Sequence, residues 1–453
     1  MISKDTLLEI KQSVNLSQIV GLFAKLTYRG KRQSCLCPFH SEKTPSFFID
    51  ESDRFFYCFG CGAKGDSIEF VRKKLSLSFS EAIEWICEKF KIPIKYTSDK
   101  NQSNFRLYKL LEDCENLLNR ALRSCPTALD YLKSRSIKDE TTQAFCLGFN
   151  PGTMYLSKSL LELNYNLNEL LDLGLVCYSK NGRILDFFRD RLTIPLKDHR
   201  GKTVGFAGRV ISEGEPKYLN SKDSPIFKKS LILFNLSQVL KSSSKKVYLV
   251  EGYFDVISLH QAGLPAVCSC GSSISSEQIK MLEQFFDTVV FVFDGDNAGR
   301  KATFKAVLET ANSRFSSKFI LLPDGVDPDT FIRHSVAEFQ NLPQLDPEAA
   351  LIASYLKLVG KDNFFELSRP EIWTLTSHIK SYLSSIMNPL ARKVSEKNLK
   401  HALARLFQTS PKSTVFNLSL EQVLAMYKPL PDLANAQSLS LSKPPKKPLI
   451  IIN

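Results

Sequence analysis

The pattern of apolar and polar residues changes several times along this chain, and each change predicts a different kind of structure. Leu and Phe recur at helical spacing over residues 105–123, and a second helical stretch covers residues 345–407. Between them, residues 183–235 alternate apolar and polar positions between Gly turns, as strands do. From residue 247 to residue 333, short apolar runs alternate with helical segments, which indicates a parallel sheet of βαβ units. The predicted fold class is therefore a multidomain protein with α+β and α/β parts.

The length of 453 residues is enough for about three domains, and composition changes mark where they divide. The first part is rich in Cys and aromatic residues, and a short polar stretch after it is typical of a linker. The last part is rich in Ser, Pro and Lys, which predicts a largely disordered tail. The expected parts are a Cys-rich unit at 1–95, a linker at 96–104, a first mixed α/β part at 105–240, a parallel-sheet domain at 241–335, a helical part at 336–407 and a tail at 408–453.

Acidic residues follow three of the predicted strands at the point where each strand ends. Glu251 comes after VYLV, Asp294 and Asp296 come after TVVFVF, and Asp327 and Asp329 come shortly after FILLP. In an open parallel sheet the carboxyl ends of the strands meet at one edge, so we expect these carboxylates to converge there. Unpaired, they would repel one another and lose hydration, and their natural counter-charge is a hard divalent cation such as Mg²⁺. Metal-assisted phosphoryl chemistry is the first interpretation.

Some of these carboxylates also have a purely structural interpretation. Asp294 and Asp296 could cap the helix that opens at residues 297–299, yet capping leaves the third acidic pair on the same edge unexplained. Asp255 follows Glu251 by one helical turn. We interpret Asp255 as a charge at a helix N-terminus rather than as a residue that supports the metal site.

Four residues near the N-terminus have the spacing of zinc ligands. A C-x2-H pair and a C-x2-C pair are separated by 17 residues, and the four residues are Cys37, His40, Cys58 and Cys61. Each pair fits a tight turn that directs two ligands at one tetrahedral ion, and four protein ligands make a closed, structural site. Cys35, two residues upstream, is an alternative ligand. Chance clustering of these residue types is the competing interpretation.

The net charge of +13 is concentrated rather than spread evenly. Residues 181–246 hold fourteen Lys or Arg against six Asp or Glu. This balance favours a polyanionic ligand, a nucleic acid or a nucleoside triphosphate, over a generally basic surface. Aromatic residues around the zinc pattern alternate with Lys43, Arg54 and Lys64. As one face they suit single-stranded bases, and ring by ring they suit a small zinc-ribbon core.

The cysteine content and the apolar runs bear on the cellular compartment. The segment MISKDTLLEIKQ predicts an amphipathic helix and contains no apolar secretory stretch. No run approaches the roughly 20 apolar residues that span a bilayer. Eleven cysteines in such a chain are expected to be thiols or metal ligands, so we expect a protein of the reducing cytoplasm with no membrane partner.

These motifs resemble those of a known family. Glu-Gly at 251–252 followed by Asp-Gly-Asp at 294–296 resembles the Toprim domain of bacterial-type primases, topoisomerases and some nucleases. Motifs in the same order, from the N-terminus to about residue 335, look like a bacterial replicative DNA primase of the DnaG type: CPFH…CFGC, RDRLTIPLKDHRGKTVGFAGRV, PKYLNSKDSPIFKKS and VEGYFDV…FDGDNAGRKA…LPDGVDPDTF. The resemblance implies a zinc ribbon, a mixed α/β primase core with a Toprim parallel sheet, and a helical C-terminal part.

The resemblance also implies roles for individual residues. Glu251, Asp294 and Asp296 would be catalytic and hold Mg²⁺, with Asp327 and Asp329 as supporting ligands. The nucleotide and nucleic-acid groove would consist of Arg135, Arg209, Lys217, Tyr218, Asn220 and Lys228.

Other residues of the same motifs fit less well. Arg189 and Arg191 rank lower for the groove, since either could form a surface ion pair with Asp186 or Asp190. The sequence departs from the family pattern at Ala207, where Gly is expected. It also departs in CSCGSSIS, a loop usually made of small residues, which here has Cys270 before its Gly.

The activity implied is synthesis of short RNA primers on single-stranded DNA from ribonucleoside triphosphates. One structural zinc and two catalytic Mg²⁺ ions are expected as cofactors, with Mn²⁺ as an alternative to Mg²⁺. The replicative helicase is the expected partner at the replication fork, although we expect no full helicase-binding domain in the tail. Two rival interpretations are a Toprim-family nuclease, revealed by DNA cleavage without ribonucleotides, and a non-catalytic zinc-ribbon replisome component, whose DNA binding would not depend on Glu251.

Overall fold

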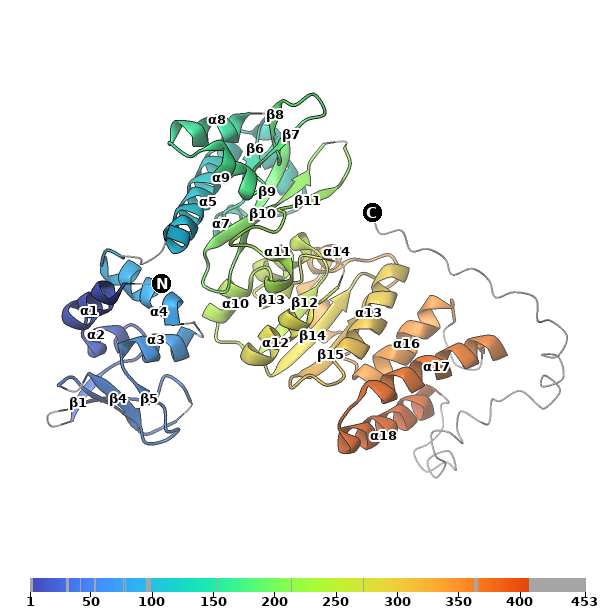
Figure 1. Ribbon diagram of the computed structural model, residues 1–453. Coiled ribbons are helices and arrows are strands. Elements are labelled where there is room, and N and C mark those ends of the chain that lie inside the picture. The colour runs from blue at the N-terminus through green and yellow to red at the C-terminus, as the bar shows by residue number, and fades with distance from the viewer. Residues whose placement is uncertain are drawn as a thin grey trace, which may run out of the picture. The chain divides into compact units, whose positions relative to one another are not determined.

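Among the described residues the chain forms two compact units, one within residues 1–116 and 157–176 and the other within residues 117–156 and 177–406; their helices and strands are labelled in Figure 1. In this computed structural model the described residues are 3–29, 32–40, 42–52, 54–75, 77, 79–94, 99–152, 154–212, 214–271, 273–361 and 366–406. The predicted tail at 408–453 lies outside them. Among the described helices, none is both long enough and apolar enough to cross a bilayer.

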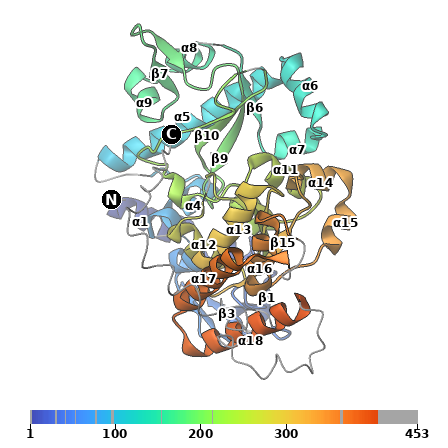
Figure 2. The same cartoon turned by 90° about the vertical axis from the view of Figure 1, so that its right-hand side faces the viewer.

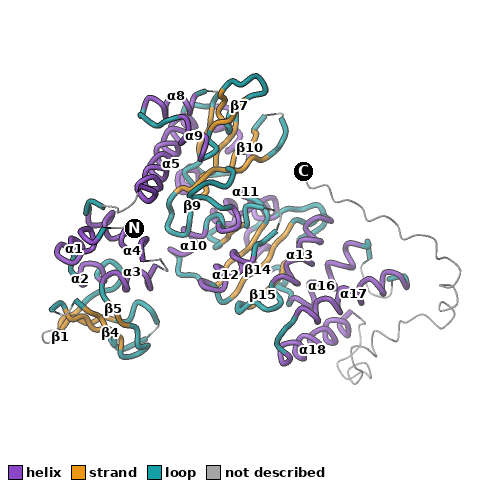
Figure 3. Tube along the Cα trace, viewed as in Figure 1, coloured by secondary structure: helices purple, strands orange, loops and turns teal. Residues whose placement is uncertain are grey.

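The first unit contains an antiparallel sheet whose strands follow one another in sequence order (Figure 3). Its strands are β1 (Thr27–Arg29), β2 (Arg32–Cys35), β3 (Phe47–Asp50), β4 (Phe55–Cys58) and β5 (Lys64–Gly65). Helices of this unit include α1 (Lys4–Ser13), α2 (Leu16–Val20), α3 (Ser67–Leu75) and α4 (Phe79–Phe90). Alternation along β3 and β4 buries Phe47 and Phe56, whose ring centroids lie 5.0 Å apart. These two rings are core residues, whereas Phe55, Tyr57 and Phe59 of the same aromatic run stay exposed.

Helix α5 (Asp99–Arg123) begins inside the range that we expected to be a linker. The linker expected at 96–104 therefore extends too far, because polar composition alone does not separate a linker from the first turns of a solvated helix. Further along α5, Leu107, Leu110, Leu111 and Cys114 recur at helical spacing and are buried, as the sequence pattern predicts. Two short helices, α8 (Tyr155–Glu162) and α9 (Leu167–Asp172), follow later in the chain. Arg106 of α5 forms an ion pair with Glu169 of α9.

The second unit contains an antiparallel sheet of strand order β11-β10-β9-β6. Its strands are β6 (Gly148–Asn150), β9 (Arg191–Lys197), β10 (Thr203–Val210) and β11 (Tyr218–Asn220). The pairing register sets Arg209 opposite Tyr218 and Ala207 opposite Asn220. Smaller elements around this sheet are α6 (Pro126–Ser134), α7 (Asp139–Ala144), β7 (Val176–Tyr178), β8 (Ile184–Asp186), the 3₁₀ turn η1 (Lys229–Leu231) and α10 (Leu236–Lys241).

The parallel sheet predicted from the apolar runs is present, with strand order β13-β12-β14-β15. Its strands are β12 (Lys246–Val250), β13 (Ala266–Cys268), β14 (Thr288–Phe293) and β15 (Ser316–Leu321). The helices between and after them are α11 (Tyr253–Gln261), α12 (Ser276–Phe285), α13 (Asn297–Glu309) and α14 (Pro328–His334). Helix α11 packs against α14. Because all four strands run in the same direction, their carboxyl ends share one edge.

The remaining described part of the chain is helical, in agreement with the sequence pattern. It consists of α15 (Val336–Asn341), α16 (Pro347–Leu358), α17 (Arg369–Ser385) and α18 (Pro389–Leu406). Helix α16 packs against α13 and β15 (Figure 2). Leu351, Leu375, Leu399 and Phe319 belong to one buried cluster, so these helices extend the hydrophobic core of the parallel sheet.

Candidate functional site

The predicted zinc ligands lie together in the first unit. One ligand atom each from Cys37, His40, Cys58 and Cys61 lies within 4.8 Å of all the others. The Sγ atoms of Cys37 and Cys61 are 3.8 Å apart, and Cys58 Sγ is 3.9 Å from His40 Nδ1. Bonds of about 2.3 Å around a tetrahedral ion give a sulfur–sulfur edge of roughly 3.8 Å, so the group fits zinc. Cys35, the alternative ligand, is not a member of this group.

Glu42 supports this site and was not among the residues predicted for it. Its Oε2 lies 3.2 Å from Nε2 of His40, which leaves the opposite nitrogen, Nδ1, facing the cysteine sulfurs. Its Oε1 accepts hydrogen bonds from the backbone N–H groups of Cys37 and Ser46. A carboxylate that orients a ligating imidazole in this way raises its basicity and fixes its tautomer. Gly60 is also constrained, because a Cβ there would lie 2.6 Å from His40 Nε2.

Four of the five predicted rim carboxylates form what we call the acidic rim: Glu251, Asp294, Asp296 and Asp327. Glu251 follows β12, and its Oε1 accepts a hydrogen bond of 3.0 Å from the backbone N–H of Asp294, directly after β14. Asp296 caps α13 by accepting from Gly299 N–H at 2.8 Å. Asp327 caps α14 by accepting from Thr330 N–H at 2.6 Å. The helix-capping interpretation is therefore confirmed for Asp296, whose charge also acts on Glu251 and Asp294.

Two glycines allow the backbone of the rim to close tightly around Asp294. A Cβ on Gly295 would lie 1.9 Å from the carbonyl oxygen of Pro323, and a Cβ on Gly299 would lie 2.0 Å from that of Asp294. The N–H of Gly295 donates to Val326, and its carbonyl accepts from Gly325 N–H. These contacts join the loop after β14 to the loop after β15 and hold the carboxylates of both in place.

The electrostatics of the rim are unfavourable without a cation. Burial, together with the charges of Glu251, Asp327 and Asp296, raises the pKa of Asp294 to about 7, while Lys217 opposes the shift. Burial and the charge of Asp296 also raise the pKa of Glu251. Among the described side chains, Asp294 Oδ1 is buried and lacks a hydrogen-bond partner. An unpaired oxygen among three further carboxylates is the environment that a hard divalent cation would satisfy.

Asp329 is engaged differently from the residues of the acidic rim. It is 2% exposed, and its two oxygens lie 2.8 Å from Arg135 Nη1 and 3.1 Å from Arg333 Nε. Ser258 donates a further hydrogen bond to it. Because these partners contact both oxygens, the structure favours a role for Asp329 in positioning Arg135 over the predicted role as a supporting metal ligand. Arg333 was not among the predicted site residues. Its spacing of four residues from Asp329 on one helix is the sequence feature that could have indicated this ion pair.

Asp255 connects the start of α11 to the start of α14. Its Oδ2 accepts from Gly252 N–H, as expected for a charge at a helix N-terminus, and its Oδ1 accepts from Asp329 N–H. Burial, then the charges of Asp294 and Asp327, raise the pKa of Asp255 to about 7. The Asp255 carboxylate therefore lies close to the acidic rim. From the sequence we had favoured a charge at a helix N-terminus over a position beside the metal site.

Two of the predicted groove arginines share one aromatic cluster. The guanidinium carbons of Arg135 and Arg209 each lie 5.0 Å from the ring centroid of Phe254 and 5.6 Å from that of Tyr131. Arg209 also contacts the hydroxyl of Tyr218. Its Nε is buried and, among the described residues, has no hydrogen-bond partner. Two adjacent guanidinium groups with an unused buried donor suit an anion such as a phosphate.

The other predicted groove residues have varied surroundings. Asn220 accepts a 2.7 Å hydrogen bond from the hydroxyl of Tyr253 and donates to the carbonyl of Cys270. Lys217 is exposed and acts electrostatically on Asp294. Lys228 is exposed at the start of η1. Arg191, which we ranked lower, is buried and donates to the carbonyls of Gly208 and Lys217, a structural role.

Known proteins match this chain in each of its described parts. Family profiles match as the CHC2 zinc finger over residues 2–102, the N-terminal domain of the DNA primase catalytic core over 117–240, and a Toprim-like domain over 248–332. The DNA primase of Rickettsia felis is 35% identical over 416 residues, covering 88% of this chain and 67% of the relative. That of Pseudomonas aeruginosa is 34% identical over 443 residues, covering 93% and 65%.

Solved structures give the same result. The crystal structure of the Aquifex aeolicus primase, with zinc-binding and RNA polymerase domains, aligns with a TM-score of 0.57 at 29% identity and covers 89% of this chain and 97% of that one. A DnaG primase catalytic domain bound to single-stranded DNA aligns with a TM-score of 0.56 at 28% identity, covering 67% and 99%. Zinc ribbon, core and Toprim sheet thus match in the order in which the motifs occur, and the chain belongs to the DNA primase family of the DnaG type.

Proposed function

We propose that the acidic rim binds Mg²⁺ and that this DNA primase joins ribonucleotides there. As a DNA primase, the protein synthesises RNA primers for replication. The identity of the metal ion, the substrates and the roles of individual residues are our proposals. The observation that carries the proposal is the buried Oδ1 of Asp294, which has no hydrogen-bond partner among the described residues and lies beside Glu251, Asp296 and Asp327. Such a group of oxygens suits Mg²⁺, which usually completes its coordination with water and substrate phosphates.

Each residue of the acidic rim has a distinct task in this proposal. Glu251, Asp294 and Asp296 would hold the ions, with Asp327 as a supporting ligand. Bound divalent ions, two in the arrangement expected for this chemistry, polarise phosphate oxygens and the attacking 3′-hydroxyl. Gly295 and Gly299 keep the carboxylates in place, so little reorganisation is needed when charge develops.

The cationic residues would bind the phosphates of the nucleotide and of the growing strand. Arg209 offers an unused buried Nε–H, and Arg135 is oriented beside it by Asp329 and the ring of Phe254. Lys217 and Lys228 add exposed positive charge. Tyr218 and Asn220 would position the nucleotide from the edge of the antiparallel sheet. In this arrangement Asp329 contributes through Arg135 and not through a metal ion.

The partners follow from the same chemistry. We propose a single-stranded DNA template, since a similar catalytic domain is described as bound to single-stranded DNA, and ribonucleoside triphosphates as substrates. The replicative helicase at the replication fork, in the cytoplasm, remains the proposed protein partner. We also keep as proposals the division at 1–95, 105–240, 241–335 and 336–407, although the compact units divide the chain within α5.

The experiment is primer synthesis on single-stranded DNA with Mg²⁺ and labelled ribonucleotides. Wild-type protein should yield short RNA, and Glu251→Gln should yield none. Glu277→Gln, which makes the same change at an exposed position on α12, should behave as wild type. DNA cleavage in the absence of ribonucleotides would favour the nuclease alternative instead. Synthesis that survives in Glu251→Gln would refute the assignment of the metal site.

A further inference from the structure

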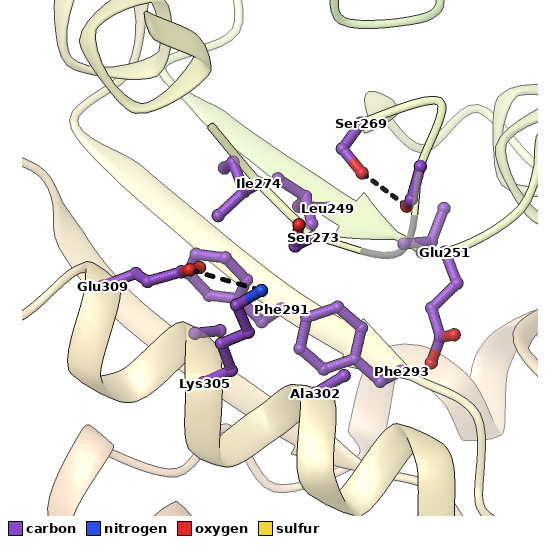
Figure 4. A pocket seen from close by; sticks show the side chains of 13 residues that line it. Leu249, Glu251, Ser269, Ser273, Ile274, Phe291, Phe293, Ala302, Lys305 and Glu309 are labelled. Carbon is purple, nitrogen blue, oxygen red and sulfur yellow. Dashed lines mark hydrogen bonds and ion pairs between the residues drawn. The ribbon is translucent and has the colours of Figure 1, made fainter. Parts of the chain in front are cut away.

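A slot opens beside the acidic rim, on one face of the parallel sheet (Figure 4). It lies between α13 and the loop that precedes α12. Glu251 lines the slot and also belongs to the acidic rim, so the two are continuous.

The walls of the slot are apolar, and one of them is aromatic. Phe291 and Phe293 of β14 face it together with Leu249 of β12 and Ile274 of the loop. The two phenylalanine ring centroids are 6.1 Å apart with an interplanar angle of 44°. On the α13 side the slot is lined by Ala302, a small side chain, and Phe293 is partly exposed. A partly exposed aromatic ring with little side-chain bulk near it suits a flat ring.

Charged groups surround the slot on several sides. Lys305 and Glu309 of α13 form an ion pair of 3.7 Å and line it together. This pair can donate to a ring carbonyl and accept from ring N–H groups, a combination that the edges of guanine and of uracil both offer. On the loop side, Lys229 lies against Gly271, since a Cβ on that glycine would be 3.4 Å from the lysine Nζ. A cation therefore lies next to Gly271, which lines the slot.

We propose that the slot receives the base of a ribonucleoside triphosphate whose phosphates lie at the acidic rim. The inference rests on the proposed function, because the rim must hold the phosphates. Glu251 places rim and slot side by side, Phe293 supplies the stacking surface, and the Lys305–Glu309 pair supplies the edge contacts. Base–aromatic stacking alone gives about a tenfold gain in affinity or more.

The test compares the binding of GTP and of inorganic tripolyphosphate, which carries no base, by calorimetry with Mg²⁺ present and zinc bound. Four proteins are measured: wild type, Ala302→Leu, which fills the slot, Phe293→Leu, which removes the stacking ring, and Ala391→Leu. The last makes the same change as Ala302→Leu on the exposed surface of α18. Binding of tripolyphosphate also reports whether each variant is folded and holds its metal.

We expect GTP to bind wild type and Ala391→Leu about tenfold more tightly than tripolyphosphate. In both slot variants the two ligands should bind with nearly equal affinity, with tripolyphosphate unchanged. A tenfold preference for GTP that persists in both slot variants would place the base elsewhere and overturn the inference. The same holds if wild type does not distinguish the two ligands. If wild type binds neither ligand, the metal assignment at the rim fails, and the inference fails with it.

Discussion

Replacing Asp294 with Asn should stabilise the metal-free protein while abolishing synthesis. The carboxylate is forced into a site where burial and three neighbouring carboxylates raise its pKa from 3.8 to about 7. A carboxyl group whose folded pKa is raised contributes stability that is complete below its unfolded pKa and is lost as the pH rises through the folded pKa. Wild-type protein without Mg²⁺ should therefore lose stability between about pH 4 and pH 7. The neutral amide of Asn removes this loss.

The size of the effect follows from the shift in pKa. An increase of about three units corresponds to roughly 4 kcal/mol at most. Asp294 is partly exposed, and solvent screening reduces this to about 1–2 kcal/mol in the free energy of unfolding. For a unit of this size we expect the melting temperature of Asp294→Asn to exceed that of wild type by roughly 2–4 °C at pH 8. At pH 4 the two melting temperatures should be nearly equal.

Scanning calorimetry at the two pH values, without Mg²⁺ and without strong chelators so that zinc stays bound, measures this difference. Asp287→Asn is the matched control, because Asp287 is exposed just before the other end of β14 and should show no such pH dependence. Saturating Mg²⁺ should reverse the order, since a ligand at 100 times its Kd stabilises wild type by about 2.7 kcal/mol. If Asp294→Asn is destabilised to the same extent at both pH values, the carboxylate is not under electrostatic stress and the reasoning is wrong.

Three further changes test other parts of the structure. Gly299→Ala should lower the free energy of unfolding by about 2–4 kcal/mol, since its Cβ would lie 2.0 Å from the Asp294 carbonyl. Gly152→Ala, with no atom within 4 Å of the added Cβ, is the control in the same urea titration. Glu42→Gln should weaken zinc binding about 10–100-fold in a chelator competition, because His40 loses its carboxylate partner; unchanged affinity would remove Glu42 from the zinc site. Arg333→Met should cost about 1–3 kcal/mol of stability and lower the rate of primer synthesis by loosening Asp329 and Arg135. Thermal unfolding and a primer assay measure the two effects, and an unchanged rate would contradict the positioning role of Asp329.

Features encoded by neighbouring residues were predictable from the sequence. The zinc ligands follow from two short spacings, and the ends of β12, β14 and β15 follow from apolar runs that stop at a carboxylate or a turn. Helix capping and metal binding could not be separated for Asp296, because one carboxylate serves a helix end and the rim at once.

Features that depend on tertiary contacts were not predictable. Arg135, at the C-terminal end of α6, forms an ion pair with Asp329, although the two residues are 194 positions apart in the sequence. No pattern among neighbouring residues indicates this pair. Glu42 and Asp255 act through backbone N–H groups whose positions are set only once the chain has folded. The linker expected at 96–104 shows the same limit, since polar residues there are compatible with the first turns of α5.

The rim places opposite demands on stability and on metal binding. The backbone at Gly295 and at Gly299, in the first turn of α13, is packed closely against Pro323 and Asp294, which limits how far the carboxylates can move apart. Asp329 is neutralised by Arg135 and Arg333, whereas Asp294 keeps a buried oxygen that has no partner among the described residues. The fold therefore neutralises the charge of Asp329 with two arginines and leaves the charge of Asp294 for a cation to neutralise. Because protons and the cation compete for the same carboxylates, metal affinity should rise with pH over the range in which the metal-free protein becomes less stable. The same electrostatic stress would thus account for both properties of the rim.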